Sequence, residues 1–152
     1  MSRLSYTIRQ AMASGSVASL VSTAALAGCG TRDCRSAYAP VNAVSHWLWR
    51  DTAVYQQRAT LRYTLAGYLI HHSMSILWAV AYEAWLGARP RPAWQACAAG
   101  LGVAGAACLV DLKATPQRLT PGFERRLSGP SLAGVYAAFG IGLALMRIAR
   151  RS

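Results

Sequence analysis

The stretch LRYTLAGYLIHHSMSILWAVAYEAW, residues 61–85, decides the fold. It carries no charged side chain over residues 63–82, yet it contains the adjacent histidines His71 and His72. A helix of roughly 17–25 mainly apolar residues is long enough to cross a bilayer. The stretch therefore predicts a transmembrane helix over about residues 63–85 that presents a polar face.

Three other uncharged runs have the length of a membrane span, and the four runs together fill most of the chain. The additional spans are expected at about residues 10–28, 92–112 and 130–147. Charged residues make up only 14% of the sequence, well below the roughly 25% of soluble proteins. A soluble alanine-rich bundle is the alternative, but its exposed faces would carry charges at helical spacing, and these runs carry none. The sequence predicts an all-α fold, a polytopic four-transmembrane-helix bundle that forms a single membrane domain over residues 1–152.

The loop between the first two expected spans contains a short helical pattern at about residues 40–50. Pro40 suits the first turn of a helix, and Val41, Val44 and Leu48 fall on one side of it. The tryptophans of this segment favour a short interfacial helix at the level of the lipid head groups. A lid helix packed on the bundle would show the same pattern, so both interpretations stay open.

Small residues recur every four positions in two of the spans, a spacing that lets helices approach closely in lipid. The short connection after the second span predicts that the second and third spans are antiparallel neighbours. Glycines among the alanines of the third span predict that it is the central helix. These faces favour self-association or contact with other membrane proteins. The positions are Gly15, Ser19 and Thr23 in the first span and Gly134, Ala138 and Gly142 in the fourth.

The net charge of +11 comes almost wholly from arginine, with Lys113 as the single lysine. The arginines are dispersed beside the apolar runs, which favours contact with anionic lipid head groups and not with nucleic acid. They divide almost evenly between the two sides of a four-span chain, so the positive-inside rule gives no orientation. The arginines near the C-terminus lead us to place both termini in the cytoplasm.

One face of the second span carries polar and aromatic side chains at alternating spacings of three and four. Because unsatisfied polar groups are costly in hydrocarbon, this face is expected to point into the bundle. The opposite arc, which includes Leu69, Ile70 and Leu77, is expected to face lipid. The polar face consists of Tyr68, His71, Ser75, Trp78 and Tyr82, with His72 beside it.

Depth along antiparallel helices brings several polar residues to one membrane face. His71 lies about two turns into the second span and Asp111 lies at the end of the third, so both are expected beside Asn42 and His46 of the first loop. Glu83 is expected at the opposite face, paired with arginines of the short connection. The candidate polar site comprises Asn42, His46, Tyr68, His71, His72, Ser75 and Asp111.

These residues fit several roles. His46, His71 and Asp111 would be the ligands of a first-row metal such as zinc, or two histidines would hold a haem iron. The same groups would line a path for a polar solute or for protons. In the structural alternative no cofactor is bound, the histidines form hydrogen bonds between helices, and Asp111 pairs with Lys113 or an arginine of the first loop. Neighbouring residues point about 100° apart on a helix, so His71 and His72 are poorly placed to share one ion.

The four cysteines do not form a metal-binding pattern. Cys97 and Cys108 lie in one expected helix and are interpreted as small apolar fillers. Cys29 and Cys34 would form a disulfide if their loop faced an oxidising compartment. Residues 26–29, Leu-Ala-Gly-Cys, also have the form of a lipoprotein cleavage box, and cleavage there would leave three spans behind a lipidated Cys29.

Three stretches carry a resemblance to a known group of proteins: APVNAVSHWLW, RYTLAGYLIHHSMSILWAVAYE and DLKATPQRLTPGFERRLS. They resemble an uncharacterised family of small four-span inner-membrane proteins of proteobacteria, over most of the chain. The resemblance implies a four-span fold and an inner-membrane location, and it implies no activity. In that family the junction that corresponds to Gly28 and Cys29 does not have the form of a cleavage box, which argues against lipidation.

The sequence contains no nucleophile elbow, phosphate loop or paired-carboxylate signature. We therefore expect a non-enzymatic structural or assembly component of a membrane complex. The alternative is a binder or carrier of a metal, haem or small polar solute through the candidate polar site.

Overall fold

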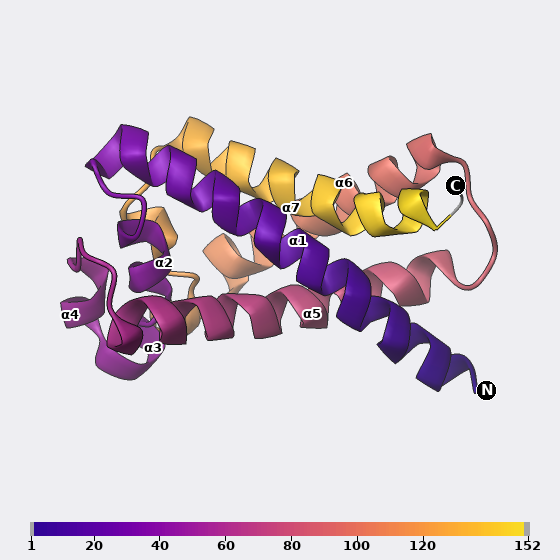
Figure 1. Ribbon diagram of the computed structural model, residues 1–152, viewed down its shortest axis with the longest axis horizontal. Helices are drawn as coiled ribbons and strands as arrows, with labels where there is room; N and C mark the ends of the chain where they lie inside the picture. The colour runs from indigo at the N-terminus through magenta and orange to yellow at the C-terminus, as the bar shows by residue number, and fades with distance from the viewer. Residues whose placement is uncertain (1, 151–152) are drawn as a thin grey trace.

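Four long helices make up most of the molecule, and the computed structural model describes residues 2–150 (Figure 1). Within these residues there is no β-strand, so the all-α prediction is confirmed. The long helices are α1 (Arg3–Cys34), α5 (Ala66–Leu86), α6 (Ala93–Leu109) and α7 (Gly129–Ala149).

The short elements gather at one end of the bundle, which we call the loop end. The first loop forms α2 (Ala39–Val44), α3 (His46–Trp49) and α4 (Asp51–Val54). π-helical turns precede α5 and follow α6, and two 3-10 turns lie in the third loop. They are η1 (Leu61–Leu65), η2 (Val110–Ala114), η3 (Gln117–Leu119) and η4 (Phe123–Arg125). The opposite end, which we call the terminal end, holds both ends of the described chain and the α5–α6 connection (Figure 1).

Helix α1 crosses the bundle and packs along both α5 and α7, while α6 packs mainly along α7. The sequence predicted α6 as the central helix, and this is wrong because α1, and not α6, packs along two long helices, which small residues allow. A Cβ atom on Gly15 would lie 2.7 Å from the Cα of Ile76 in α5. A Cβ atom on Gly142 would lie 2.6 Å from the Cα of Ala18 in α1.

Helices α5 and α6 are consecutive and antiparallel, yet they contact each other much less than either contacts its other neighbour. Near their connection Trp85 lies beside Gly102, 3.6 Å from the position a Cβ atom would take there. Helix α6 instead meets α7, where Gly100 and Gly140 bring the two backbones into direct contact. The order around the bundle is therefore α5, α1, α7, α6, with the loosest contact between α5 and α6.

The pattern at residues 40–50 forms two short helices that separate at Ser45, and not one helix. Every residue of α2 is buried, since Pro40 packs on Gly30 of α1 and the Val41 carbonyl packs on Gly67 of α5. Leu48 lies on α3 and is exposed. Helix α2 therefore has the contacts of a lid packed on the bundle, the second of the two interpretations.

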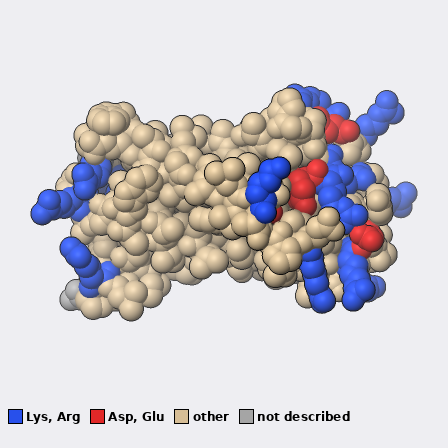
Figure 2. Space-filling model, turned by 180° about the vertical axis from the view of Figure 1, so that it is seen from behind, with Lys and Arg blue, Asp and Glu red and all other residues tan. Residues whose placement is uncertain are grey.

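Among the described residues, three helices are long and apolar enough to cross a membrane: α1, α6 together with its π turn, and α7. Helix α5 does not reach the same mean hydropathy, because His71, His72 and Glu83 lie within it. Figure 2 shows the basic and acidic side chains gathered toward the two ends of the molecule, with a broad uncharged zone between them.

The cysteines are all free thiols. Helix α1 continues to Cys34, so Cys29 and Cys34 lie in one helix and do not form the disulfide that the sequence allowed. The Cys34 thiol instead donates to the Gly30 carbonyl at 3.2 Å. The possible cleavage box lies inside the same helix, with Leu26 fully buried.

Candidate functional site

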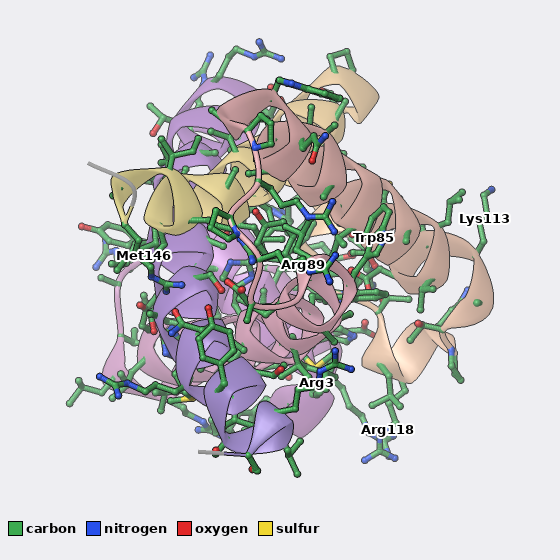
Figure 3. All side chains as sticks on the ribbon, turned by 90° about the vertical axis from the view of Figure 1, so that its right-hand side faces the viewer. Arg3, Trp85, Arg89, Lys113, Arg118 and Met146 are labelled. Atoms are coloured by element: carbon green, nitrogen blue, oxygen red, sulfur yellow. The ribbon has the colours of Figure 1, made fainter. Side chains whose placement is uncertain are left out.

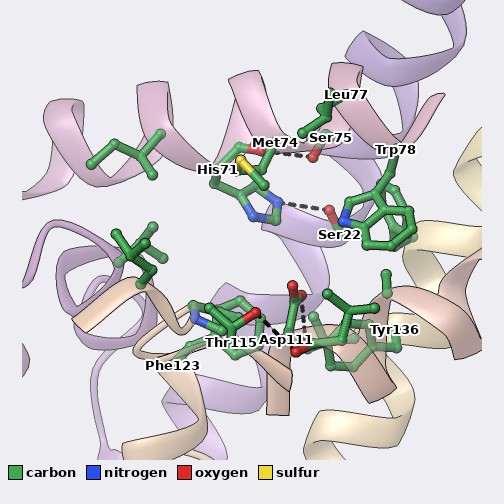
Figure 4. A pocket seen from close by; sticks show the side chains of 18 of the residues that line it. Ser22, His71, Met74, Ser75, Leu77, Trp78, Asp111, Thr115, Phe123 and Tyr136 are labelled. Carbon is green, nitrogen blue, oxygen red and sulfur yellow. Dashed lines mark hydrogen bonds between the residues drawn. The ribbon is translucent and has the colours of Figure 1, made fainter. Parts of the chain in front are cut away.

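A pocket of about 300 Å³ lies between α5 and α6 near the loop end (Figure 4). Helix α5 forms one wall with His71 and Ser75, and η2 contributes Asp111 to the opposite wall. Tyr136 of α7, Ser22 of α1 and Thr115 after η2 add further polar groups to the lining. The pocket thus occupies the place where the two consecutive helices separate.

His71 is fixed by one side-chain hydrogen bond, between its Nε2 and the Ser22 Oγ at 2.9 Å. The Ser22 Oγ also lies 2.7 Å from the Ala18 carbonyl oxygen and 3.2 Å from that of Ser19. It accepts from Nε2 in one tautomer of the imidazole and donates to Nε2 in the other. Phe123 packs edge-on against the ring, with 6.5 Å between the centroids, and holds its orientation.

Asp111 faces His71 across the pocket (Figure 4). Its Oδ2 accepts a hydrogen bond from the Tyr136 phenol at 2.9 Å. Lys113, two residues further on, is exposed and points away from the bundle (Figure 3). Within residues 2–150 Asp111 forms no ion pair, so the predicted pairing with Lys113 or an arginine of the first loop is wrong. The η2 turn directs the carboxylate inward to a phenol of α7 instead.

The polar face predicted on α5 divides between two environments. Ser75 is buried, lines the pocket and donates to the His71 carbonyl at 2.8 Å. Tyr68 and His72 stack on each other outside the pocket, with ring centroids 5.6 Å apart. Tyr82 is fully buried nearer the terminal end, where its hydroxyl donates to the Ala96 carbonyl of α6 at 3.2 Å.

His46 and Asn42 stabilise the first loop and do not line the pocket. The His46 ring nitrogens lie 2.9 Å from the Ala43 carbonyl oxygen and 3.3 Å from that of Gln117. The Asn42 amide donates to the carbonyls of Gln56 and Arg58 at 3.1 and 3.0 Å. Its oxygen accepts from the Thr64 hydroxyl at 2.6 Å, so the fully buried side chain joins the loop to the start of α5.

The structure does not assemble the metal ligands considered above. Among residues 2–150 no three histidine, cysteine, aspartate or glutamate side chains gather closely enough to hold an ion. His46 is engaged by two carbonyls, and His71 and Asp111 belong to opposite walls of the pocket.

Glu83 lies at the terminal end, as expected, but its partner differs from the prediction. Its carboxylate pairs with Arg147 of α7 at 3.0 Å, and the side chains are only 1% and 8% exposed. Arg147 also donates to the carbonyls of Gly87 and Arg89. Arg89 thus contributes its backbone and not its side chain, and it lies over this end of the bundle in Figure 3.

The pocket contains functional groups that sequence reasoning missed, chiefly Ser22, Tyr136 and Phe123. A tyrosine in the middle of an apolar helix needs an acceptor for its phenol, so Tyr136 was a recognisable partner for a buried acid. Ser22 is one of several hydroxyl residues in α1, and nothing in the sequence separates it from the others.

Apolar side chains form the rim of the pocket. Leu77 of α5 is 60% exposed, Val110 of η2 is 42% exposed and Leu119 of η3 is 46% exposed, and all three belong to the lining. The pocket therefore opens on the outer surface of the bundle between α5 and α6, through a rim of apolar groups.

No family model, curated protein or solved structure matches this chain.

Proposed function

We propose that this protein is a four-span inner-membrane protein that binds a small, largely apolar molecule in the pocket between α5 and α6. The uncharged zone between the charged ends matches a hydrocarbon layer. Helix α5 crosses with the others, because its polar groups Ser75, Tyr82 and Glu83 are buried inward while Leu69 and Leu77 face outward. Both termini lie on the cytoplasmic side in this arrangement.

The observation that carries the proposal is the exposed apolar rim of the pocket. In a bilayer, an opening between two helices that is bordered by Leu77, Val110 and Leu119 faces the lipid chains. An apolar molecule dissolved in the membrane would enter from the side without crossing water. The volume of about 300 Å³ lies at the lower end of ligand pockets, which run from roughly 300 to 1,000 Å³.

The lining favours an apolar ligand over the polar solute considered from the sequence. Ligand sites are typically lined by apolar and aromatic side chains with a few polar groups that orient the ligand. Here those groups are His71 and Asp111, which face each other (Figure 4). The assembly role stays a prediction, and Gly15 and Gly142, two of the small residues that suggested it, already pack against helices of the same chain.

The exposed apolar residues of the loop end would lie at the lipid head groups. Leu48, Tyr55 and Leu61 are all exposed there. The Arg62 guanidinium lies over the Trp49 ring, 5.2 Å from its centroid, an arrangement suited to the interface between water and lipid. The first loop would thus cover the bundle with α2 and contact the membrane surface with α3.

The proposal is tested by filling the pocket. Met74 lines it from α5, so Met74→Trp occupies the cavity, whereas Leu69→Trp adds the same side chain on an exposed position of the same helix. The three proteins would be purified in lipid nanodiscs, and small molecules extracted from them would be measured by mass spectrometry. We expect a compound that is enriched with the wild type and Leu69→Trp and reduced at least about tenfold with Met74→Trp. Equal amounts in all three, or no enriched compound in the wild type, would contradict a binding role for the pocket.

A further inference from the structure

The pocket carries a single charged side chain, and that charge is negative. Among the described residues, Asp111 is the only aspartate, glutamate, lysine or arginine of the lining, although the chain contains 16 lysines and arginines. Its one side-chain partner there is the neutral phenol of Tyr136. A half-buried carboxylate without a counter-charge favours a ligand that supplies one.

The hydroxyl groups of the lining also favour a ligand that donates hydrogen bonds. Ser75 donates its only proton to the His71 carbonyl, and Thr115 donates its proton to the Val110 carbonyl at 2.9 Å. These two hydroxyls therefore offer a ligand lone pairs and not protons. The pocket thus presents further acceptors beside its carboxylate.

Aromatic side chains also line the pocket. Trp47, Trp78, Phe123, Tyr136 and Phe139 all belong to the lining. The faces of aromatic rings attract organic cations, most strongly where water is excluded. A carboxylate among such rings is a common arrangement for the recognition of ammonium groups.

We propose that the ligand is a protonated amine attached to an apolar body, with its ammonium group at Asp111 and its apolar part directed toward the rim. This inference rests on the binding function proposed above and specifies its ligand class. The ammonium group donates to the Asp111 carboxylate, and the surrounding rings contact its alkyl substituents. A carboxylic acid of the same size is excluded because it would bring a second negative charge to Asp111.

The test compares three probes with one apolar body: 4-phenylbutylamine, 4-phenylbutanol and 4-phenylbutanoic acid. Binding would be measured calorimetrically to the protein in phosphatidylcholine nanodiscs, with empty nanodiscs as the blank for partition into lipid. We expect the amine to bind at least about tenfold more tightly than the alcohol, and the acid more weakly than either. Equal affinity for amine and alcohol would overturn the ammonium inference and leave the apolar pocket in place. No binding of any probe, together with no effect of Met74→Trp on extracted compounds, would overturn the binding function itself.

Asp111→Asn removes the charge while it keeps an acceptor for Tyr136. We expect the amine to lose its advantage over the alcohol in this variant, with the affinity of the alcohol unchanged. Asp51→Asn is the matched control, because Asp51 is an exposed aspartate outside the pocket at the same end of the molecule. If the Asp111→Asn variant still preferred the amine, groups other than Asp111 would cause the selectivity, and the proposal would be contradicted. If Asp111→Asn does not fold, the three-probe comparison on the wild type decides alone.

Discussion

Glu83 and Arg147 form an ion pair at the terminal end that is almost completely shielded from solvent. Removing one partner of a buried pair leaves an uncompensated charge, which typically costs roughly 3–5 kcal/mol. We therefore expect Arg147→Met to lower the free energy of unfolding by about that amount. Denaturant titration in detergent would measure it, with loss of helical circular dichroism as the readout.

The control for this prediction is the ion pair of Arg125 with Asp51, at 2.8 Å, whose side chains are 40% and 74% exposed. Exposed pairs contribute about 0–1 kcal/mol, so Arg125→Met should change stability little. Adding Glu83→Gln to Arg147→Met removes the orphaned charge and should restore much of the loss. Equal effects of the two arginine variants would show that burial of the pair is not what matters.

At the scale of single residues, the sequence led to a polar site near one end of the bundle but not to the hydrogen-bond partners within it. The depths of His71 and Asp111 along antiparallel helices predicted that they lie near one end together with Asn42 and His46, and of these four only His71 and Asp111 line the pocket. The choice of Tyr136 as the partner of Asp111 depends on the rotation of α7 about its axis and on the π turn after α6. Neither can be derived from hydrophobic spacing, since every face of α7 is largely apolar.

Among the elements, α6 and α7 are joined by a backbone contact that only glycine permits. A Cβ atom on Gly100 would overlap the carbonyl oxygen of Gly140. Gly105, one turn further along α6, has open space at the same position. We expect Gly100→Ala to destabilise the protein by about 1–3 kcal/mol and Gly105→Ala to stay within about 0.5 kcal/mol of the wild type. Thermal unfolding of both variants in the same detergent measures the difference, and equal melting temperatures would contradict this account of the helix contact.

The uncharged runs predicted the existence and order of the long helices, while their ends and partners required the structure. The first span was expected at residues 10–28, but α1 covers Arg3–Cys34 because polar and charged residues at its ends also adopt helical structure. The segment at 40–50 divided into α2, which packs on the bundle as a buried lid because Gly30 and Gly67 provide close contacts for it on α1 and α5, and α3, which carries the exposed Leu48. Such contacts come from residues distant in sequence, which a local pattern does not contain.

At the scale of the whole molecule, the crossing of α5 decides the topology. If all four long helices cross the membrane, the two termini lie on the same side, in agreement with their common end in Figure 1. If α5 stayed out of the hydrocarbon, α1, α6 and α7 would be the only spans and the termini would lie on opposite sides. The sides of the two termini therefore distinguish the two arrangements directly.

A fluorescent protein that folds only in the cytoplasm, fused before Met1 or after Ser152, provides the measurement. We expect both fusions to fluoresce, because α5 buries Ser75, Tyr82 and Glu83 in the bundle and leaves Leu69 and Leu77 to the lipid. As a control, a phosphatase active only in the periplasm and fused after Gln57, an exposed residue of the loop end, should be active. Fluorescence from one terminus alone would mean three spans and would remove the lipid-facing entrance to the pocket, because α5 would then lie outside the hydrocarbon. Two dark fusions with an inactive phosphatase would keep four spans and reverse the orientation, so that the pocket would lie near the cytoplasmic face.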